Sequence, residues 1–528
     1  MARLKEYNGH YCESEYEYAF IGFLEAEGWK YSSGNNIHRV TKRDVLIADD
    51  FKKFIADTNP DLTEDEVIQI YDNVRLVGAE SDFATLHKVY GWMVNGVQFT
   101  PQDELPRMIP LIDFDNWDKN IFRVVNQFTV EYTNNGQKEN RRPDVLLFVN
   151  GIPLCVIELK NPTDANASIY DAWEQINIRY WRDIPHLLHY CPLACISDGV
   201  KTRLGTVRTP YEHFYAWRRV NEGDVVSTLP FAETETMIKG VYTPERFVEI
   251  FRDYIYFQDS IYDCDEVEIV CRYPQFFAAK LLKQSIVNSV VTRSGKGGTY
   301  FGATGCGKTY TMAFLARQLA LRCTDIPEIG SPTIILIVDR DELQKQGSKL
   351  FTKSKEFLNL GEVSVVKNRT QLRQELGARQ SGGFYICTIQ KFCDREDDKI
   401  GLINDRQNII CFSDEAHRTQ LEHSKKIQFS KDADENMKAM VSKPYAKVLK
   451  EAFPHATFVG FTGTPIAETY QTFGDEIDRY TMDQAVADGL TVSIKYHPRI
   501  AKVLLDNKKV KEIENYYKKC ADDGATYE

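Results

Sequence analysis

One stretch of the sequence has the residue types and spacing of a phosphate-binding loop. It begins at Gly302, directly after the strand-forming run 298–301, and leads into a helix-forming run. Glycines allow backbone N–H groups to turn toward phosphate oxygens, and a helix N-terminus adds partial positive charge. The lysine can reach the terminal phosphates, and the threonine hydroxyl after it can bind Mg²⁺. The sequence therefore predicts a nucleotide site made of Thr304, Gly305, Cys306, Gly307, Lys308 and Thr309.

A second group of residues could bind a metal ion and cut a phosphodiester bond. Asp144 begins one apolar run, and Glu158 and Lys160 end the next. Two carboxylates offer hard oxygen ligands to Mg²⁺, which activates a water molecule, and a lysine neutralises developing charge. This Asp…Glu-x-Lys pattern is typical of PD-(D/E)xK nucleases. It predicts Asp144 and Glu158 as metal ligands and Lys160 as a catalytic residue, whereas the alternative is an ordinary edge hairpin with charged ends.

The turn at Asn150-Gly151 decides whether the two carboxylates can meet. Asn-Gly between two β-rich runs is a strong hairpin signal. A strict two-residue turn pairs Asp144 with Ile157, which sends Glu158 to the opposite face. We therefore predict that the pairing register slips by one residue. A type I turn with a bulge at the glycine would do this, as would another local break in pairing.

Two glutamines are candidates for supporting roles. Gln175 lies in the run 171–181, which predicts a helix after the hairpin. There it could support the metal site or hold a DNA phosphate, or it could belong to a polar helix face. Gln275, in Arg272-Tyr-Pro-Gln275, can both donate to and accept from an adenine edge.

The second half of the chain predicts a parallel sheet with ligands at the ends of its strands. Apolar runs that end in polar residues are found at 333–338, 385–388, 409–412 and 457–461. Ligands bind at the carboxyl ends of strands in open parallel sheets. After the third run, Asp414 is suited to an outer contact with Mg²⁺, and Glu415 to polarising the attacking water. His417, Thr462 and Thr464 are suited to passing the nucleotide state to bound nucleic acid.

Composition limits the class of protein. The chain has 528 residues, which predicts two or three domains, and its net charge of −11 excludes a protein that coats polyanions indiscriminately. A local basic channel remains compatible with that charge. The longest strongly apolar run, Ile334–Val338, is too short to cross a bilayer, and the N-terminus has no apolar signal core. We therefore expect a cytoplasmic protein, with its twelve cysteines reduced.

One cluster of histidine and cysteine could suggest zinc. The spacing lacks the two separated ligand pairs of structural zinc sites. The residues after Pro192 also resemble a strand that enters a core, which we take as the interpretation. The cluster consists of His186, His189, Cys191 and Cys195.

Local patterns predict the elements around these groups. Phe20, Phe23 and Leu24 have helical spacing in the run 13–27, and Glu17 on that helix is expected to be a solvated surface charge. Further predicted elements are a capping box at Thr63 and Glu66, strands around an Asp198-Gly199 turn within 191–207, and a connecting helix from Pro244 to about 257.

Taken together, these motifs resemble the restriction (motor) subunit of type I restriction-modification enzymes. The resemblance covers nearly the whole chain. It rests on Val124-Val-Asn-Gln127-Phe, Arg141-Arg-Pro-Asp144, Phe148–Leu154, Glu158-Leu-Lys160, Ile196–Gly199, Arg272–Gln275, the phosphate loop, Asp339-Arg340, Thr388-Ile-Gln390, Asp414–His417, Gly460–Pro465 and Tyr480–Gly489.

This resemblance implies an α/β protein that acts on double-stranded DNA. A restriction-endonuclease-like domain is expected at 1–240, a connecting helix and linker at 241–267, and a first RecA-like superfamily 2 motor domain at 268–500. The family uses ATP to reel in DNA, cuts it with Mg²⁺ at a distance from the recognised site, and assembles with methyltransferase and specificity subunits.

Two departures from the family pattern affect these expectations. The family helix usually carries Gln-x-x-x-Tyr, but here Arg179 takes the tyrosine place and Tyr180 comes one residue later. The family also continues with a second motor domain, whereas 501–528 predicts only the start of a linker. We expect a truncated chain that hydrolyses ATP poorly.

Two other functions stay open at this point. One is a repair-type or type III nuclease-translocase, although in type III enzymes the nuclease usually follows the motor. The other is a DNA-binding scaffold whose nuclease hairpin has lost its activity.

Overall fold

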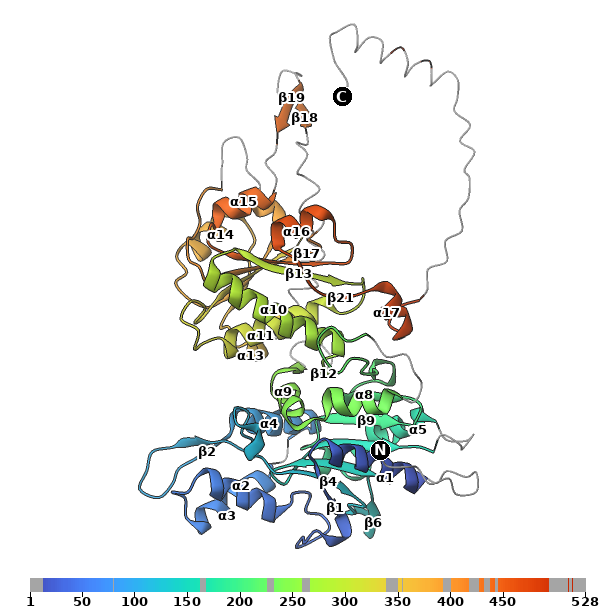
Figure 1. The fold of residues 1–528 in the computed structure, drawn as a ribbon. Coiled ribbons are helices and arrows are strands. Elements are labelled where there is room, and N and C mark those ends of the chain that lie inside the picture. The colour runs from blue at the N-terminus through green and yellow to red at the C-terminus, as the bar shows by residue number, and fades with distance from the viewer. Residues whose placement is uncertain are drawn as a thin grey trace. The chain divides into compact units, whose positions relative to one another are not determined.

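The computed structural model describes residues 13–78, 80–161, 168–225, 232–258, 266–338, 350–353, 355–392, 400–416, 427–431, 437–441, 445–492, 511 and 515. Residues up to Leu490 form one compact unit and Thr491–Glu528 a second. The first unit contains two large sheets, one on each side of α9, which spans Pro244–Asp253 (Figure 1). Helices connect many of the strands in both sheets, so the predicted α/β class is confirmed. Within the described part of the chain, no helix is long and apolar enough to span a membrane.

The N-terminal sheet has six strands in the order β1-β4-β7-β8-β9-β10. Their bounds are β1 Lys30–Ser33, β4 Phe122–Asn126, β7 Val145–Val149, β8 Ile152–Leu159, β9 Leu193–Ser197 and β10 Thr202–Thr206. β7, β8 and β9 are buried along their whole length, because helices cover both faces. The predicted strands around Asp198-Gly199 are β9 and β10.

One end of this sheet collects the strand termini that matter for function. β1 and β4 run parallel, as do β8 and β9, while β4 pairs antiparallel with β7 and β7 with β8. The last residues of β1, β4, β8 and β9 therefore lie at the same end as the first residue of β7. We call this the carboxylate end, because Asp144 precedes β7 there.

The helices of this half begin and end largely where their capping residues predict. Thr63 and Glu66 form the expected capping box at the start of α3. In α1, Phe20 and Leu24 are buried, but Phe23 is 43% exposed. The helices are α1 Glu13–Ala26, α2 Ala48–Thr58, α3 Glu64–Arg75, α4 Asp82–Asn95, α5 Ile169–Glu174, α6 Trp181–Asp183, α7 Pro185–Leu188 and α8 Ala232–Val241.

The connection between the two sheets contains the predicted helix, α9, and a small hairpin. α9 begins at Pro244 as expected but ends at Asp253, earlier than the expected 257. The hairpin pairs β11 Ile255–Gln258 with β12 Val267–Val270. α10, Tyr273–Thr292, then leads to the second sheet.

The second sheet has seven strands in the order β15-β16-β14-β17-β20-β13-β21, all paired in parallel. This confirms the predicted parallel sheet. Its strands are β13 Lys296–Gly302, β14 Thr333–Val338, β15 Val363–Val365, β16 Phe384–Thr388, β17 Ile409–Asp414, β20 Thr457–Thr462 and β21 Glu476–Tyr480. Its helices are α11 Lys308–Arg322, α13 Lys355–Leu358, α14 Arg369–Gly377, α15 Tyr445–Ala452, α16 Ala467–Phe473 and α17 Met482–Ala487.

The remaining small elements lie outside the two main sheets. They are the pairs β2 Val97–Phe99 with β3 Arg107–Ile109, β5 Val130–Asn134 with β6 Gln137–Arg141, and β18 Ile427–Lys431 with β19 Met437–Val441.

Candidate functional site

A bulge inside β8 brings the two carboxylates of the hairpin onto one face. Along the ladder, the register pairs Val149 with Ile152 at the turn and Val145 with Ile157 at the far end. One residue of β8, Leu154, therefore has no partner on β7. Because of this extra residue, Asp144 comes opposite Glu158, and the predicted register slip is confirmed.

The position of the bulge differs from the favoured prediction, which placed it at Gly151. The turn is an ordinary two-residue one, in which Asn150 and Gly151 both have positive φ (51° and 76°). Asn150 is held in this conformation because its side-chain amide donates a hydrogen bond to the carbonyl of Leu111 at 2.9 Å. A Cβ at Gly151 would lie 2.2 Å from the carbonyl oxygen of Ile47. The surroundings thus fix the tight turn, and the break in pairing lies farther along the strand.

The two carboxylates lie close together but are not equally satisfied. Asp144 accepts a hydrogen bond from the backbone N–H of Leu159 at 2.8 Å. Glu158 is 0% exposed, and its Oε2 has no hydrogen-bond partner in the described structure. The Lys160 ammonium lies 3.9 Å from that same oxygen. A buried carboxylate oxygen without a partner is costly, so a cation beside it would be strongly favoured.

Electrostatics support this view of Glu158. Burial raises the pKa of Glu158 well above its ordinary value, and the charge of Asp144 raises it further. Lys160 and the hydroxyl of Tyr180 act in the opposite direction on this pKa. Without a cation the pair therefore favours the protonated form of Glu158, and a divalent ion would displace that proton.

A π-helix brings Tyr180 into contact with Glu158. Residues Gln175–Tyr180 form π-helical turns, in which hydrogen bonds span five residues instead of four. Tyr180 donates to Glu158 Oε1 at 2.6 Å, and Gln175 donates to the Tyr180 hydroxyl at 2.8 Å. Arg179 is exposed and pairs with Glu174. The wider turn absorbs the extra residue in this sequence.

Gln175 also completes a closed ring of polar contacts. Its side-chain oxygen accepts from the ammonium of Lys160 at 3.1 Å. The ring runs from Lys160 through Gln175 and Tyr180 to Glu158. It fixes the positions of the lysine and of Glu158 Oε1, while Glu158 Oε2 has the Lys160 ammonium at 3.9 Å and no hydrogen bond.

The nucleotide loop joins β13 to α11 as the sequence predicts. Gly305 and Gly307 have φ of 82° and 84°, which requires glycine-like freedom. The Lys308 ammonium donates to the carbonyl of Gly302 at 3.2 Å and lies 3.8 Å from Glu415 Oε1. Of the loop residues, Thr304 and Gly305 are exposed, Cys306 is buried, and Thr309 is partly exposed.

Asp414 ends β17 and is partly buried. Burial, together with the charge of Glu415, raises the pKa of Asp414 to about 6, and Lys308 opposes this shift. Glu415 itself has a positive φ of 47°, which is uncommon for a residue with a side chain. These three charged groups come together where the carboxyl ends of the parallel strands meet.

Gln275 contacts the loop rather than open solvent. Its oxygen accepts from the backbone N–H of Arg272 at 2.9 Å, and its amide donates to the carbonyl of Gly307 at 3.3 Å. Arg272 donates to the carbonyl of Cys306 at 3.0 Å. Gln275 is 2% exposed, and its predicted role with adenine stays a prediction.

Comparisons with known proteins match both halves of the chain. The family of the type I restriction enzyme R protein N terminus matches residues 11–213, and the SWI2/SNF2 ATPase family matches 274–526. A type I restriction enzyme endonuclease subunit of Haemophilus influenzae is 31% identical, over 92% of this chain and 46% of the relative. One from Methanocaldococcus jannaschii is 29% identical, over 97% and 48%. The chain belongs to the R subunits of type I restriction enzymes.

This membership confirms the resemblance drawn from the motifs. The chain spans about half the length of these R-subunit relatives. The SWI2/SNF2 match also fits the seven-stranded parallel sheet, so the second half of the chain is an ATPase domain of the superfamily 2 helicase type.

One residue near the carboxylates was not predicted. Glu17 of α1 is 6% exposed, so the expectation of a solvated charge was wrong. It accepts from the amide of Asn126 at 2.6 Å and from that of Gln127 at 3.4 Å. Burial raises its pKa, and the charge of Asp144 raises it further. The available signal was its spacing, since Glu17 lies three residues before Phe20 on the buried side of α1.

Several other predicted residues have different outcomes. Thr462 is buried, and its hydroxyl accepts from the backbone N–H of Thr464 at 3.1 Å. His417, like the motif Asp339-Arg340, lies outside the described residues. Their predicted roles stay predictions.

The cluster considered for zinc has other partners. His189 lies 2.9 Å from Asp82, and the Cys191 thiol donates to the carbonyl of Pro153 at 3.3 Å. Over the described ranges, no group of three or more His, Cys, Asp or Glu side chains could hold a metal ion. A cation in the R-subunit hairpin would therefore take two carboxylates from the protein and its remaining ligands from water, backbone or DNA.

Proposed function

We propose that this chain uses ATP to translocate double-stranded DNA and cuts it with Mg²⁺, as the restriction subunit of a type I restriction-modification complex. The observation that carries the proposal is the convergence of Asp144, Glu158 and Lys160, with a buried oxygen of Glu158 left without a hydrogen-bond partner. Its partners would be DNA and the methyltransferase and specificity subunits. Residues 1–240 would be the nuclease domain, 241–267 the connection, and 268–500 the motor domain.

The nuclease chemistry follows from how the chain holds its side chains. Bound Mg²⁺ would activate a water and stabilise negative charge on the phosphate. Asp144 and Glu158 would hold it, and Tyr180 would orient the Glu158 carboxylate through its hydrogen bond. Lys160, held by Gln175, would stabilise charge on the attacked phosphate or position the water.

The ATP site would use the residues gathered around the loop. Lys308 would exchange the Gly302 carbonyl for a phosphate oxygen, and the Thr309 hydroxyl and Asp414 would stand toward Mg²⁺. Glu415 would polarise the attacking water. Gln275 and Arg272 hold the backbone of the loop, which keeps its N–H groups directed toward the phosphates.

The test removes one metal ligand. Asp144→Ala should reduce ATP-dependent plasmid cutting by the complex with methyltransferase and specificity subunits to background. It should also abolish Mg²⁺ binding at this site, measured by titration calorimetry of the chain. Asp57→Ala, which removes an exposed carboxylate of α2, is the matched control and should leave both unchanged. Equal cutting by Asp144→Ala and wild type would contradict the proposal and favour a DNA-binding scaffold.

A further inference from the structure

A basic loop lies at the carboxylate end of the N-terminal sheet. β1 ends at Ser33 beside Asn126, the last residue of β4. Asn126 in turn pairs with Val145, the residue after Asp144. After the short 3-10 helix Gly34–Asn36, the chain forms the segment His38-Arg-Val-Thr-Lys-Arg43, which we call the basic loop. Its attachment therefore lies at the same sheet end as Asp144.

The base of this loop is held in place by buried contacts. The Arg39 guanidinium lies 3.8 Å from the centre of the Phe128 ring and donates to the carbonyls of Thr129 and Asp44. Gly34 packs so closely that a Cβ there would lie 2.6 Å from the Cα of Phe128. Burial lowers the pKa of Arg39. Arg39 thus serves to anchor the loop.

The backbone of the loop tip is also fixed. The Lys42 carbonyl accepts from the backbone N–H of Glu131 at 3.0 Å. Asp44 accepts from both the backbone N–H and the hydroxyl of Thr41. A loop with this many contacts presents its outward side chains in one arrangement, which lowers the entropy cost of binding.

The outward side chains are cationic around an apolar tip. Lys42 and Arg43 are exposed, and neither forms an ion pair with any residue in the described ranges. Between Arg39 and these two residues, Val40 is 89% exposed. Cations beside an exposed apolar residue suit the phosphates and groove of a nucleic acid duplex.

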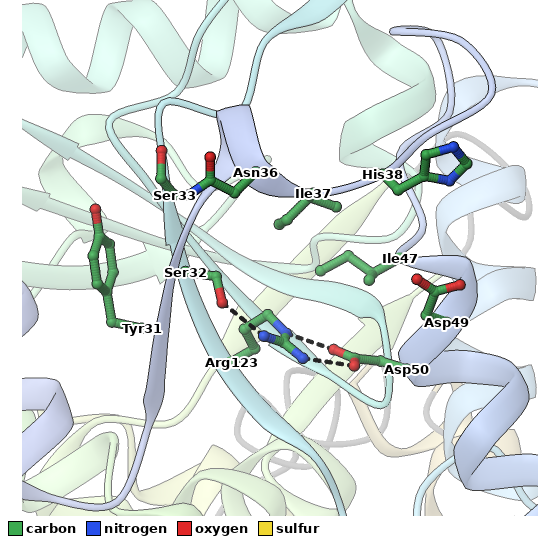
Figure 2. A pocket seen from close by; sticks show the side chains of 10 residues that line it. All are labelled: Tyr31, Ser32, Ser33, Asn36, Ile37, His38, Ile47, Asp49, Asp50 and Arg123. Carbon is green, nitrogen blue, oxygen red and sulfur yellow. Dashed lines mark hydrogen bonds and ion pairs between the residues drawn. The ribbon is translucent and has the colours of Figure 1, made fainter.

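The neighbouring pocket offers no comparable cation. It is lined by Ser32, Asp49, Asp50 and Arg123, among others, and His38 lies at its edge (Figure 2). The Arg123 guanidinium makes two bonds of 2.6 Å to Asp50 and one of 2.6 Å to Ser32. Because Arg123 is already paired with Asp50 and a second carboxylate, Asp49, also lines the pocket, this pocket does not suit phosphate. The ion pair between Arg123 and Asp50 instead holds α2 against β4.

We infer that the basic loop binds the backbone of duplex DNA and guides it to the Asp144–Glu158 site. Lys42 and Arg43 contact phosphates, and Val40 enters the groove between them. The inference rests on the proposed nuclease function, because DNA bound at this end of the sheet is presented for cutting only if the Asp144–Glu158 site cuts DNA.

The test measures binding of the 528-residue chain to a short fluorescent duplex by anisotropy, with EDTA present so that no cutting occurs. The double variant Lys42→Glu/Arg43→Glu should weaken binding by about tenfold per lost phosphate contact at 0.1 M salt. The slope of log K against log salt should become shallower by about two. Val40→Ser should weaken binding less and leave the slope unchanged.

The matched control reverses two charges at the opposite end of the sheet. Lys30 begins β1 and Lys119 precedes β4, and both are exposed. Lys30→Glu/Lys119→Glu should bind DNA like the wild type. Equal affinity and equal salt slope for the loop variant and this control would overturn the inference, as would absence of duplex binding by the wild type.

The two proposals can fail separately. Asp144→Ala should retain duplex binding in EDTA, because it lies outside the loop. If Asp144→Ala still cuts DNA while the loop variant loses binding, the proposed nuclease site is wrong and the loop stands. If Asp144→Ala stops cutting while the loop variant binds DNA normally, the loop inference is wrong and the proposed nuclease site stands.

Discussion

The carboxylate site and the nucleotide site are assembled in different ways. Residues 304–309 of the nucleotide site are consecutive, so one strand–loop–helix unit places them. The carboxylate site takes Asp144, Glu158 and Tyr180 from separate elements. Their meeting depends on an unpaired residue in β8 and on a π-helix. The first site should therefore respond mainly to changes inside its motif, and the second also to changes of register outside it.

Deletion of Leu146 from β7 should break this comparison most strongly. With one residue fewer on β7, Val145 pairs with Val156 and Asp144 with Ile157, so Asp144 moves to the face opposite Glu158. β7 is buried and apolar on both faces, so the sheet can accept the shift. DNA cutting should fall to background while ATP binding persists, as measured by plasmid cleavage and nucleotide titration.

Deletion of Gly223, in the exposed turn 221–225, is the control for chain shortening and should change neither activity. Retained cutting after loss of Leu146 would show that the register of the hairpin does not set the site.

Tyr180→Phe should have the next largest effect. It removes a hydrogen bond to a carboxylate, which is worth about 1.5–3 kcal/mol and corresponds to roughly 10–100-fold in cutting rate. That bond lowers the pKa of Glu158, so its loss raises this pKa further. The acid limb of the pH–rate profile should therefore move to higher pH. A slower rate with an unmoved profile would indicate a packing role for the ring alone.

At the nucleotide site, ATP binding should weaken as pH falls through about 6, the folded-state pKa of Asp414. Below this pH the carboxyl is protonated and no longer favours Mg²⁺. Asp414→Asn should bind Mg·ATP more weakly at pH 8 and show little change between pH 5 and 8. Fluorescent nucleotide titrations across this range measure both, and equal pH dependence in the two proteins would contradict the assignment.

The smallest effect concerns stability without metal. The raised pKa of Glu158 means that the folded state holds a proton that the unfolded state releases above its ordinary pKa. Its contribution to stability is thus present at low pH and lost as pH rises toward the folded-state pKa. Glu158→Gln should raise the melting temperature in EDTA at neutral pH by a few degrees.

Added Mg²⁺ should stabilise the wild type but not Glu158→Gln, because only the carboxylate gains from the ion. Equal increases in melting temperature in both proteins would show that the ion binds elsewhere.

The strand–loop–helix geometry around residues 304–309 was predictable because the motif consists of consecutive residues. The sequence showed that Asp144 and Glu158 can share a face only if the pairing register slips by one residue. It did not show where along the hairpin the bulge lies. The position of the bulge depends on Asn150 and Gly151, whose turn is fixed by contacts with distant segments. Such contacts leave no periodic signal in the hairpin itself.

The roles of Tyr180 and Glu17 show a second limit. A one-residue shift in a motif suggests loss of the tyrosine, yet a π-helix recovers it at small cost to the helix. Glu17 has the spacing of a buried position, but an ionisable side chain there is favoured only because Asn126 and Gln127 lie opposite. Both outcomes require knowledge of neighbours far away in the sequence.

The central claim is that Asp144 and Glu158 share one divalent ion, and crystals grown with Mn²⁺ test it most directly. We predict an anomalous difference peak about 2.0–2.3 Å from an oxygen of Asp144 and from Oε2 of Glu158, near the range of hard divalent cations. Clear density for both carboxylates with no peak between them, at a Mn²⁺ concentration that supports cutting, would contradict the account.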